Sequence, residues 1–469
     1  RFPHSPLTAS SNGSLFFPDG DKMYSTESIL AMLIQNAKLE TEAFADQQVE
    51  DVVIAIPAYY SQRERITVRR AAEAAGLKVL QLIHAPTAAA LSYGAFHRKD
   101  IDGKTTRMMV YDMGASQTTA TIVEFYPNEK KEMRMKVLGT GYNRRVGGLE
   151  FTIRLRDHLA KRWIKETEGA SKEVVNNARS MAKLLAEAER VKQVLSANSE
   201  IVSQIESLHE EKNLRLKVTR DELEGLIKDT EGSIVQPVDD ALKMSGVDLA
   251  DIKDVVLMGG ASRMPFVQRS LQSRVNRELG RFLNTDEATA MGSLFQSAHL
   301  SKGFKVKPLP VEETLIFPVE AVFSSPDPSG EIKERHSPLF PLLSVFPSSH
   351  PRSISFKSFR SDFSFIVSHA QLNHLSPLQQ SDLGTTILFE VNVKEVERAD
   401  NEMKEGDKWK EIKVGFSIDA SGIVRSTSAQ AFLERPRGTI EALTDSITGI
   451  FAKKKDDEEG NGEEKKEEN

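Results

Sequence analysis

Apolar positions between residues 50 and 302 alternate between the spacing of strands and the spacing of helices. Short, nearly continuous apolar runs at Val52–Pro57 and Val79–Ile83 predict two buried strands. Between them, Gln62–Ala75 has helical spacing, and Gly76 follows it as a helix-ending glycine. This alternation of strands with helices favours an α/β core.

The same kind of pattern continues along the chain. Apolar side chains over residues 178–197 recur at i, i+3, i+4 and i+7, which predicts a long helix. Thr219, with Glu222 three residues later, resembles a capping box and is expected to open another long helix. The remaining predicted elements are a helix at Thr87–Phe96 and strands at Arg107–Met113, Thr119–Tyr126 and Asp254–Met258.

The pattern changes after about Lys302. Nine prolines fall between residues 308 and 351, and short alternating segments such as Ser353–Phe356 and Ile387–Val391 lie among and after them. Alternation broken by prolines and polar turns predicts antiparallel β structure.

Composition and charge exclude several classes of function. A length of 469 residues indicates two or three domains. No apolar run approaches the roughly 20 residues of a membrane helix, so we expect no membrane partner. The net charge of -6 is carried by residues 456–469, with eight acidic and two basic side chains, and the neutral remainder makes a nucleic-acid partner unexpected. The absence of cysteine excludes disulfides, thiolate catalysis and cysteine zinc sites.

Two glycine-bearing turns follow apolar strands. In the first, Asp112 ends a strand and Gly114–Gln117 follows it. Small residues let backbone amides approach phosphate oxygens, and an aspartate in this position can hold a hydrated Mg²⁺. In the second, Gly259–Gly260 precedes Arg263, whose guanidinium can lie along a base or a ribose. Alone, either turn is more often plain punctuation between elements.

Six blocks of sequence, in order and at matching spacing, resemble the nucleotide-binding domain of the heat-shock protein 70 family. The resemblance is close over residues 1–302 and loose over 303–440, and Asn284–Ala288 resembles the second hinge between the family's two lobes. The six blocks are Ile54–Tyr60, Ala74–Leu80, Ala85–Gly94, Tyr111–Gly114, Val146–Glu150 and Met258–Pro265.

The resemblance implies an α/β, actin-like (ribonuclease-H-like) ATPase fold, in which two lobes clamp ATP or ADP with Mg²⁺, followed by an antiparallel β-sandwich that grips unfolded polypeptide. We therefore expect a nucleotide-binding domain at 1–302 without its N-terminal part, a linker at 303–310, a β-sandwich at 311–440 and an acidic low-complexity tail at 441–469.

Site residues follow from the same resemblance. Glu189, Lys192 and Ser196 lie three or four residues apart on one helix face, which in the family contacts base and ribose but alone would be an ordinary solvated face. Pro57 and Arg65 match residues that relay nucleotide state between domains. The expected nucleotide-binding residues are Asp112 (which would hold Mg²⁺ through water), Gly114, Ser116, Gln117, Gly147, Gly148, Glu189, Lys192, Ser196, Gly259, Gly260, Arg263 and Asp286.

Departures from the family's pattern bear on hydrolysis. Ala85 and Thr119 stand where the family usually has carboxylates, and the first phosphate hairpin with its lysine would lie before Arg1. No catalytic residue is assigned, and His84 is a candidate base by proximity alone. We expect at most a weak ATPase in the full-length protein and none in this chain.

Three features resemble the large endoplasmic-reticulum branch of the family: Leu149–Glu150 after the glycine pair, the Ala197–Asn198 helix end, and the acidic tail. They imply a luminal chaperone that holds unfolded clients under stress and serves a conventional family member as nucleotide-exchange factor. The alternative is another actin-like protein, such as a sugar kinase. The proline-rich β region after the hinge disfavours it, because kinases and actins lack that region.

A further motif is expected to be a coincidence. Asp382–Thr386 spells the family's first phosphate loop almost letter for letter, but it follows Gln379–Gln380 and not an apolar strand. We interpret it as a turn that enters the strand Ile387–Val391.

Overall fold

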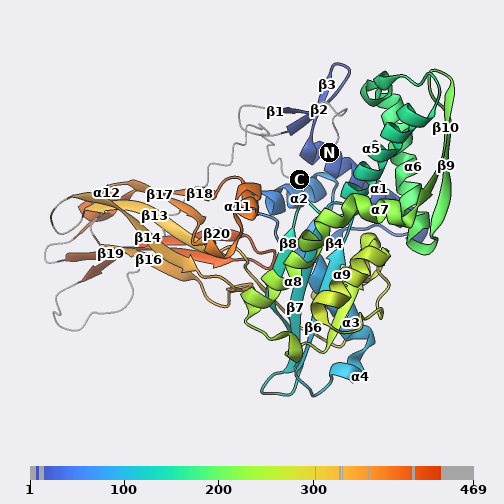
Figure 1. Cartoon of the computed structure of the whole chain (residues 1–469). Coiled ribbons are helices and arrows are strands. Elements are labelled where there is room, and N and C mark those ends of the chain that lie inside the picture. Colours follow the sequence, from blue (N-terminus) through green and yellow to red (C-terminus); the bar gives the residue numbers. More distant parts are fainter. Residues whose placement is uncertain are drawn as a thin grey trace, which may run out of the picture.

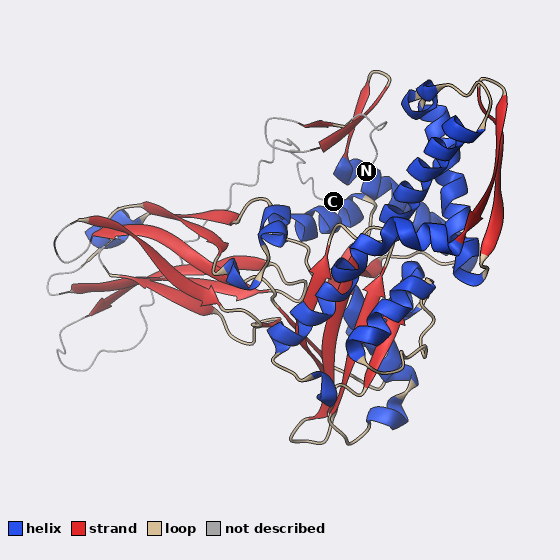
Figure 2. Cartoon of the chain, viewed as in Figure 1, coloured by secondary structure: helices blue, strands red, loops and turns tan. Residues whose placement is uncertain are grey.

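The computed structural model describes residues 7–9, 15–301, 303–326, 329, 331–357, 359–403 and 407–434. The predicted acidic tail at 441–469 therefore lies outside the described residues. Figure 1 shows a broad α/β part, coloured blue to yellow, with an elongated β part, coloured orange, extending from one side. Figure 2 shows that most helices gather around the sheets of the α/β part.

A six-stranded mixed sheet forms the centre of the α/β part. Its order is β11-β6-β7-β8-β12-β15, with β11 parallel to β6 and β12 parallel to β8. A separate pair of parallel strands, β4 and β5, lies beside it. The bounds are β4 Asp51–Ile56, β5 Lys78–His84, β6 Thr106–Met113, β7 Thr118–Pro127, β8 Met133–Asn143, β11 Asp254–Met258, β12 Val311–Thr314 and β15 Val345–Phe346.

The central sheet is buried on both faces. Successive residues of a strand point to opposite sides of the sheet, so neighbours in one strand join different cores. Along β6, Met109 and Tyr111 join one core, whereas Met108 and Val110 join the other. The first core also takes in α5, α6, α8 and α9, and the second takes in α3. The helices are α1 Thr26–Ala45, α2 Gln62–Ala74, α3 Ala85–Phe96, α4 Arg98–Ile101, α5 Gly148–Glu166, α6 Ala178–Ala197, α7 Arg220–Ile227, α8 Glu231–Ser245, α9 Pro265–Val275 and α10 Ala288–Leu300.

Smaller sheets and 3₁₀ turns complete this part. They are β1 Thr8–Ala9, β2 Leu15–Asp19 and β3 Lys22–Ser25 in one sheet, and β9 Glu200–His209 with β10 Lys212–Thr219 in another. The 3₁₀ turns are η1 Lys172–Asn176, η2 Lys228–Thr230, η3 Leu249–Asp251 and η4 Gly260–Arg263.

The strands and helices predicted before residue 302 are confirmed, with one exception. The capping box at Thr219 and Glu222 is present, but the single long helix predicted after it is wrong. The Thr230 hydroxyl donates to the main-chain oxygen of Ile227 at 2.6 Å, and a 3₁₀ turn separates α7 from α8. A side-chain hydroxyl that bonds to a nearby carbonyl competes with the main-chain hydrogen bonds of a helix.

The predicted antiparallel β structure after residue 310 is also confirmed. Two antiparallel sheets, β14-β13-β17-β18 and β16-β19-β20, enclose one core of valine, isoleucine and phenylalanine. The elements are β13 Val319–Pro326, β14 Ile332–Phe340, β16 Arg352–Phe356, β17 Phe363–His369, η5 Leu372–His374, α11 Pro377–Leu383, β18 Ile387–Val393, α12 Val396–Asn401, β19 Lys408–Ile418 and β20 Val424–Glu434.

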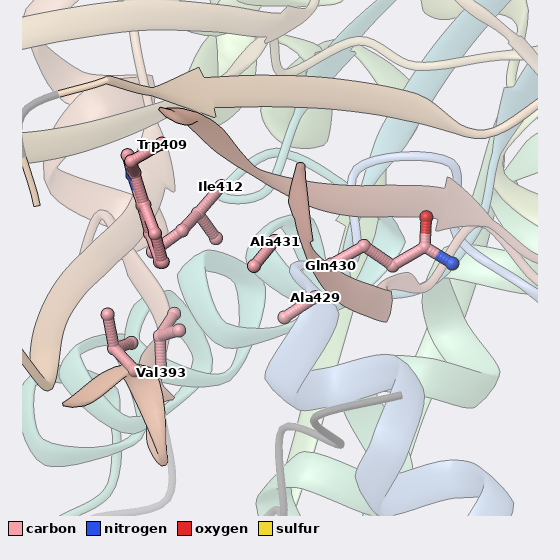
Figure 3. A pocket seen from close by; sticks show the side chains of 7 residues that line it. Val393, Trp409, Ile412, Ala429, Gln430 and Ala431 are labelled. Carbon is pink, nitrogen blue, oxygen red and sulfur yellow. The ribbon is translucent and has the colours of Figure 1, made fainter. Parts of the chain in front are cut away.

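One small gap lies in this core, between β18 and the β19–β20 pair. Val393, Trp409 and Ile412 line it together with Ala429 and Ala431, and Figure 3 shows these side chains around it. Its volume of about 10 Å³ leaves room for one water molecule at most. The side chains of the two sheets therefore fill the core here, and the gap is too small for a ligand.

The β part contacts the α/β part through a turn and a helix. Gln62 of α2 and the main chain of Val424 exchange two hydrogen bonds, of 3.3 and 2.9 Å, beside the β19–β20 turn. The second contact is α11, which lies against the end of β8, where Gln379 donates to the main-chain oxygen of Tyr142 at 2.9 Å. Within the described residues, no helix has the length and apolar character to cross a membrane.

Candidate functional site

The two glycine-bearing turns lie side by side because the strands that precede them are parallel neighbours. Met258 at the end of β11 stands opposite Asp112 near the end of β6. Gly259 has φ +80°, and a Cβ there would lie 2.5 Å from Asp112 Oδ1 and 2.4 Å from the oxygen of Met113. Only glycine allows both this backbone conformation and this approach.

The glycine pair closes over the first turn. The amide of Gly148 donates to the oxygen of Gly114 at 2.9 Å, and that of Leu149 donates to Ala115 at 2.7 Å. A Cβ on Gly147 would lie 2.5 Å from the oxygen of Ala115, so this contact also needs glycine. Within the turn, the amide of Gly114 donates to the oxygen of Gln117 at 3.1 Å, and Ser116 is exposed.

A buried lysine connects α6 to the glycine pair. Lys192 is 7% exposed, and its Nζ donates to the oxygen of Gly148 at 3.0 Å, to Thr152 Oγ1 at 2.8 Å and to Glu189 at 2.7 Å. Burial disfavours the charged form of Glu189, but hydrogen bonds from Lys192 and Thr152 outweigh burial and lower its pKa. A Cβ on Gly148 would lie 3.2 Å from both Lys192 Nζ and Ala261, so the second turn also meets this point.

The remaining expected residues lie at the edges of this cluster. Arg263 donates to Thr285 at 2.6 Å and to Asp286 at 2.5 Å, which joins the second turn to the predicted hinge. Ser196 lies one turn beyond Lys192 on α6, and its hydroxyl donates to the oxygen of Lys192 at 3.1 Å. The structure thus brings the three glycine turns together with Glu189 and Lys192, with Arg263–Asp286 and Ser196 alongside.

Asp112 is the candidate ligand for a cation. Burial raises the pKa of its carboxyl to about 6. A neighbouring cation would oppose this effect, because a positive charge favours the ionised carboxylate. No group of three or more His, Cys, Asp or Glu side chains in the described part of the chain could hold a metal. A cation at Asp112 would therefore need further donors, which suits Mg²⁺, because this ion is often held by one or two carboxylates, water and phosphate oxygens.

Pro57, Arg65 and His84 lie in a different region, where the β part docks. Arg65 is buried and donates to the oxygens of Ala58 at 3.2 Å and Ser421 at 3.0 Å, and to His84 Nε2 at 2.8 Å. His84 Nδ1 lies 3.1 Å from Glu313 of β12. Burial, with Arg65 beside it, lowers the pKa of His84 well below its usual value.

His84 is therefore a neutral, structural residue. Since Arg65 donates to Nε2, the proton of the ring sits on Nδ1 and faces Glu313. Both ring nitrogens have protein partners. The candidate base by proximity has no nitrogen left to accept a proton from water.

The coincidental phosphate-loop motif proves to be the end of a helix. Asp382 and Leu383 close α11, and Gly384, with φ +74°, follows as its cap. Leu383 is buried beside Tyr59 and Tyr142. The motif does lead into β18, as predicted, but its first two residues are helical and dock on the α/β part.

Comparison with known proteins agrees with this geometry. A family model described as Hsp70 protein matches residues 8–465. The chain belongs to the Hsp70 family. Hypoxia up-regulated protein 1 of Xenopus laevis is 38% identical over 470 residues, which cover 96% of this chain and 72% of that protein. The proteins of that name in Danio rerio and Homo sapiens are each 37% identical and are covered over 47% of their length, so this Hsp70 chain spans about half of those relatives.

Motif spacing missed two residues that support the Hsp70 site. Thr152 bonds to Lys192, Glu189 and the oxygen of Gly148, all within 3.0 Å. Its position four residues after Gly148 on α5 is the only local signal for it. Asn143 accepts the amides of Arg145 at 2.9 Å and Val146 at 3.2 Å, which shapes the turn before the glycine pair. Asn-initiated turns of this kind carry a local signal.

Proposed function

We propose that this Hsp70 chain binds ATP and ADP with Mg²⁺ at the cluster of glycine turns and acts as a chaperone. One observation supports this most strongly. Three turns that are far apart in sequence pack against one another: the amide of Gly148 donates to Gly114, a Cβ on Gly259 would touch Asp112, and a buried lysine donates to the oxygen of Gly148. Main chains this close tolerate only glycine, which restricts the sequence at these positions. Main-chain amides that are brought together in this way suit phosphate oxygens.

Each group of residues has its own proposed role in binding the nucleotide. Main-chain amides of the turn that follows Gly114 would face the phosphates, and Asp112 would orient the cation through water. The amides of Gly148 and Leu149 hold the glycine pair against that turn. When bound, Mg²⁺ supplies positive charge that offsets the phosphate charge. Glu189 and Ser196 would face the ribose and base from α6, while Lys192 donates to the oxygen of Gly148 and holds the glycine pair in place. Arg263, held by Asp286, would lie along the other side of the base.

Hydrolysis by this site is expected to be very slow. A positioned acid or base contributes roughly 10²–10⁴-fold to such a reaction. Ala85 has no ionisable group, Thr119 is buried within β7, and His84 is neutral with both nitrogens occupied. We therefore expect the site to bind nucleotide and to hydrolyse ATP very slowly.

Equilibrium binding of a fluorescent ADP analogue tests the proposal. The chain should bind the analogue in a saturable manner, unlabelled ATP and ADP should displace it, and removal of Mg²⁺ should weaken binding. Asp112→Asn should weaken binding only when Mg²⁺ is present, since the variant removes the group that orients the cation. A chain that is folded by circular dichroism yet shows no saturable binding would refute the proposed site.

The β part is proposed to hold unfolded clients. We infer the division predicted from sequence, a nucleotide-binding domain to residue 302 and a β-sandwich from residue 311, although β12 pairs with β8 of the central sheet. Excess chain should slow the aggregation of a heat-denatured enzyme without ATP. Light scattering of the client that stays unchanged at several-fold excess would contradict the holding role.

The resemblance to the large branch of the family motivates two further proposals, on exchange activity and on location. We propose that the whole protein works in the endoplasmic reticulum and speeds nucleotide release from a conventional Hsp70 partner. The rate at which a fluorescent ADP analogue leaves that partner, measured by stopped flow, should rise when the whole protein is added. An unchanged rate would remove the exchange role and leave the nucleotide site unaffected.

A further inference from the structure

Helix α11 of the β part forms hydrogen bonds with the residues that precede the glycine pair. Gln379 Nε2 donates to the oxygen of Tyr142 at 2.9 Å. The main-chain oxygen of Asp382 accepts from Arg144 Nη1 at 3.3 Å, and its carboxylate accepts from Arg145 Nη2 at 2.7 Å. One helix of two turns thus holds three of the four residues from 142 to 145.

These residues continue directly into the proposed nucleotide site. The Asn143 side chain accepts the amides of Arg145 and Val146 and so fixes the turn between them. Thr118 Oγ1 then donates to the oxygen of Val146 at 2.8 Å, and Gly147 follows at once. Only Val146 separates Arg145 from the glycine pair, and hydrogen bonds hold both its amide and its oxygen, so the position of Arg145 affects that of Gly147.

Apolar packing beneath the charges keeps α11 in place. Leu383 packs in one buried cluster with Tyr59 and Tyr142. The guanidinium of Arg144 lies 4.8 Å from the ring centre of Tyr59 and also pairs with Glu64 at 2.6 Å. The side chain of Asp382 is only 18% exposed, so its bond to Arg145 is partly shielded from solvent.

We propose that Asp382 is a positioning residue for the nucleotide site. Through Arg145 it holds the turn that keeps Gly147 and Gly148 against the phosphate-binding turn. This inference rests on the proposed function, because the glycine pair matters only if it meets a nucleotide.

Binding of the fluorescent ADP analogue to variants of the full 469-residue chain tests this role. Asp382→Asn should raise the Kd for the analogue roughly two- to fivefold, the range expected for a partly exposed ion pair. Asp400→Asn is the matched control, because Asp400 pairs with Arg360 at 2.7 Å elsewhere in the β part. Arg145→Asp should weaken binding as Asp382→Arg does, and the two together should restore the Kd to within about twofold of the wild type.

Hydrogen exchange of residues 142–149, measured without nucleotide, gives a second readout. Exchange should be faster in Asp382→Asn and unchanged in Asp400→Asn. If the wild-type chain binds no ADP analogue, the proposed function is wrong, and exchange at 142–149 alone decides whether Asp382 positions the glycine pair. Unchanged Kd and unchanged exchange in Asp382→Asn, or a charge swap that restores neither, would overturn the assignment.

Discussion

Individual glycines set how closely the main chains of the site approach one another. Gly259 and Gly147 each stand where a Cβ would lie about 2.5 Å from a neighbouring oxygen. Gly259 also needs the left-handed backbone region, whereas Gly260 beside it has open space around its Cβ position. The backbone conformation and the close contacts therefore require glycine at position 259, and the space around position 260 does not require it.

Alanine at Gly259 and alanine at Gly260 should differ in their effect on stability. Gly259→Ala should lower the unfolding free energy by roughly 1–3 kcal/mol, because it combines a strained backbone with a clash against Met113 and Asp112. Gly260→Ala should change it by less than about 0.5 kcal/mol. Urea unfolding of both variants measures this, and an equal loss in the two would contradict the assignment of the contacts.

Among the elements, α5 and α6 meet over the glycine pair through a single buried ammonium. Lys192 supplies three hydrogen bonds there, one of them to the oxygen of Gly148. A buried carbonyl that loses its donor costs about 1–3 kcal/mol. The packing of the two helices and the shape of the site thus depend on the same residue.

Lys192→Met should therefore weaken both stability and nucleotide binding. We expect a loss of roughly 1–3 kcal/mol in unfolding free energy and a higher Kd for ADP, because the glycine pair and Glu189 lose their shared donor. Lys183→Met on the same helix is the matched control, since Lys183 is only half-buried and donates to the main-chain oxygens of Glu206 and Ser207 instead. Similar effects of the two substitutions on ADP binding would show that general surface charge, and not this network, governs affinity.

Elements with a local signal could be predicted from the sequence, and those fixed by tertiary contacts could not. The apolar stripe of α6 and the runs of β4 and β11 identified these elements within a residue or so. The 3₁₀ turn before α8 contains a hydroxyl bond from Thr230 to Ile227, and no periodicity reveals it. Helix α11 carries a capping box at Ser376 and Gln379, but its docking on Tyr142 lies 237 residues away in sequence.

The same division holds for the candidate site. The family's motif spacing identified the glycine turns, the face of α6 and Arg263, because each lies in a short recognisable block. The bond of Thr152 to Lys192 and that of Asp382 to Arg145 join different elements, so only the folded chain shows these contacts. From the sequence, His84 was a candidate base. Its burial between Arg65 and Glu313 is visible only in the folded structure.

At the scale of the whole molecule, a buried polar cluster joins the β part to the α/β part. Arg65, His84 and Glu313 come from α2, β5 and β12, and Arg65 also reaches Ser421 in the β19–β20 turn. Glu313 is 1% exposed. Burial raises its pKa to about 7 although Arg65 opposes the shift. The role of Pro57 and Arg65 as a relay of nucleotide state remains a prediction, and the location of Arg65 supports it.

The raised pKa of Glu313 makes stability depend on pH. Between the ordinary value of 4.5 and about 7, the folded chain retains a proton that the unfolded chain has lost. The unfolding free energy should therefore fall as pH rises through this window, and the full cost is present above pH 7. Glu313→Gln should gain up to about 2 kcal/mol at pH 8 and nothing at pH 4.

Urea unfolding of this variant between pH 4 and pH 8 measures the difference. Glu312→Gln controls for the loss of one negative charge from the same strand, since Glu312 pairs with Arg134 nearer the surface. A Glu313→Gln gain that is the same at every pH would contradict the buried, proton-retaining carboxyl.

Photolabelling with 8-azido-ADP tests the central claim most directly, because it reports which segments surround the base. With Mg²⁺ present, the label should appear on peptides that contain residues 189–196 of α6 or the turn 259–263, and excess ADP should prevent it. Labelling should fall sharply in Gly259→Ala and persist in Asp400→Asn. Label found mainly on peptides from 377–386, or label that excess ADP does not compete away, would contradict a nucleotide site built from the three glycine turns.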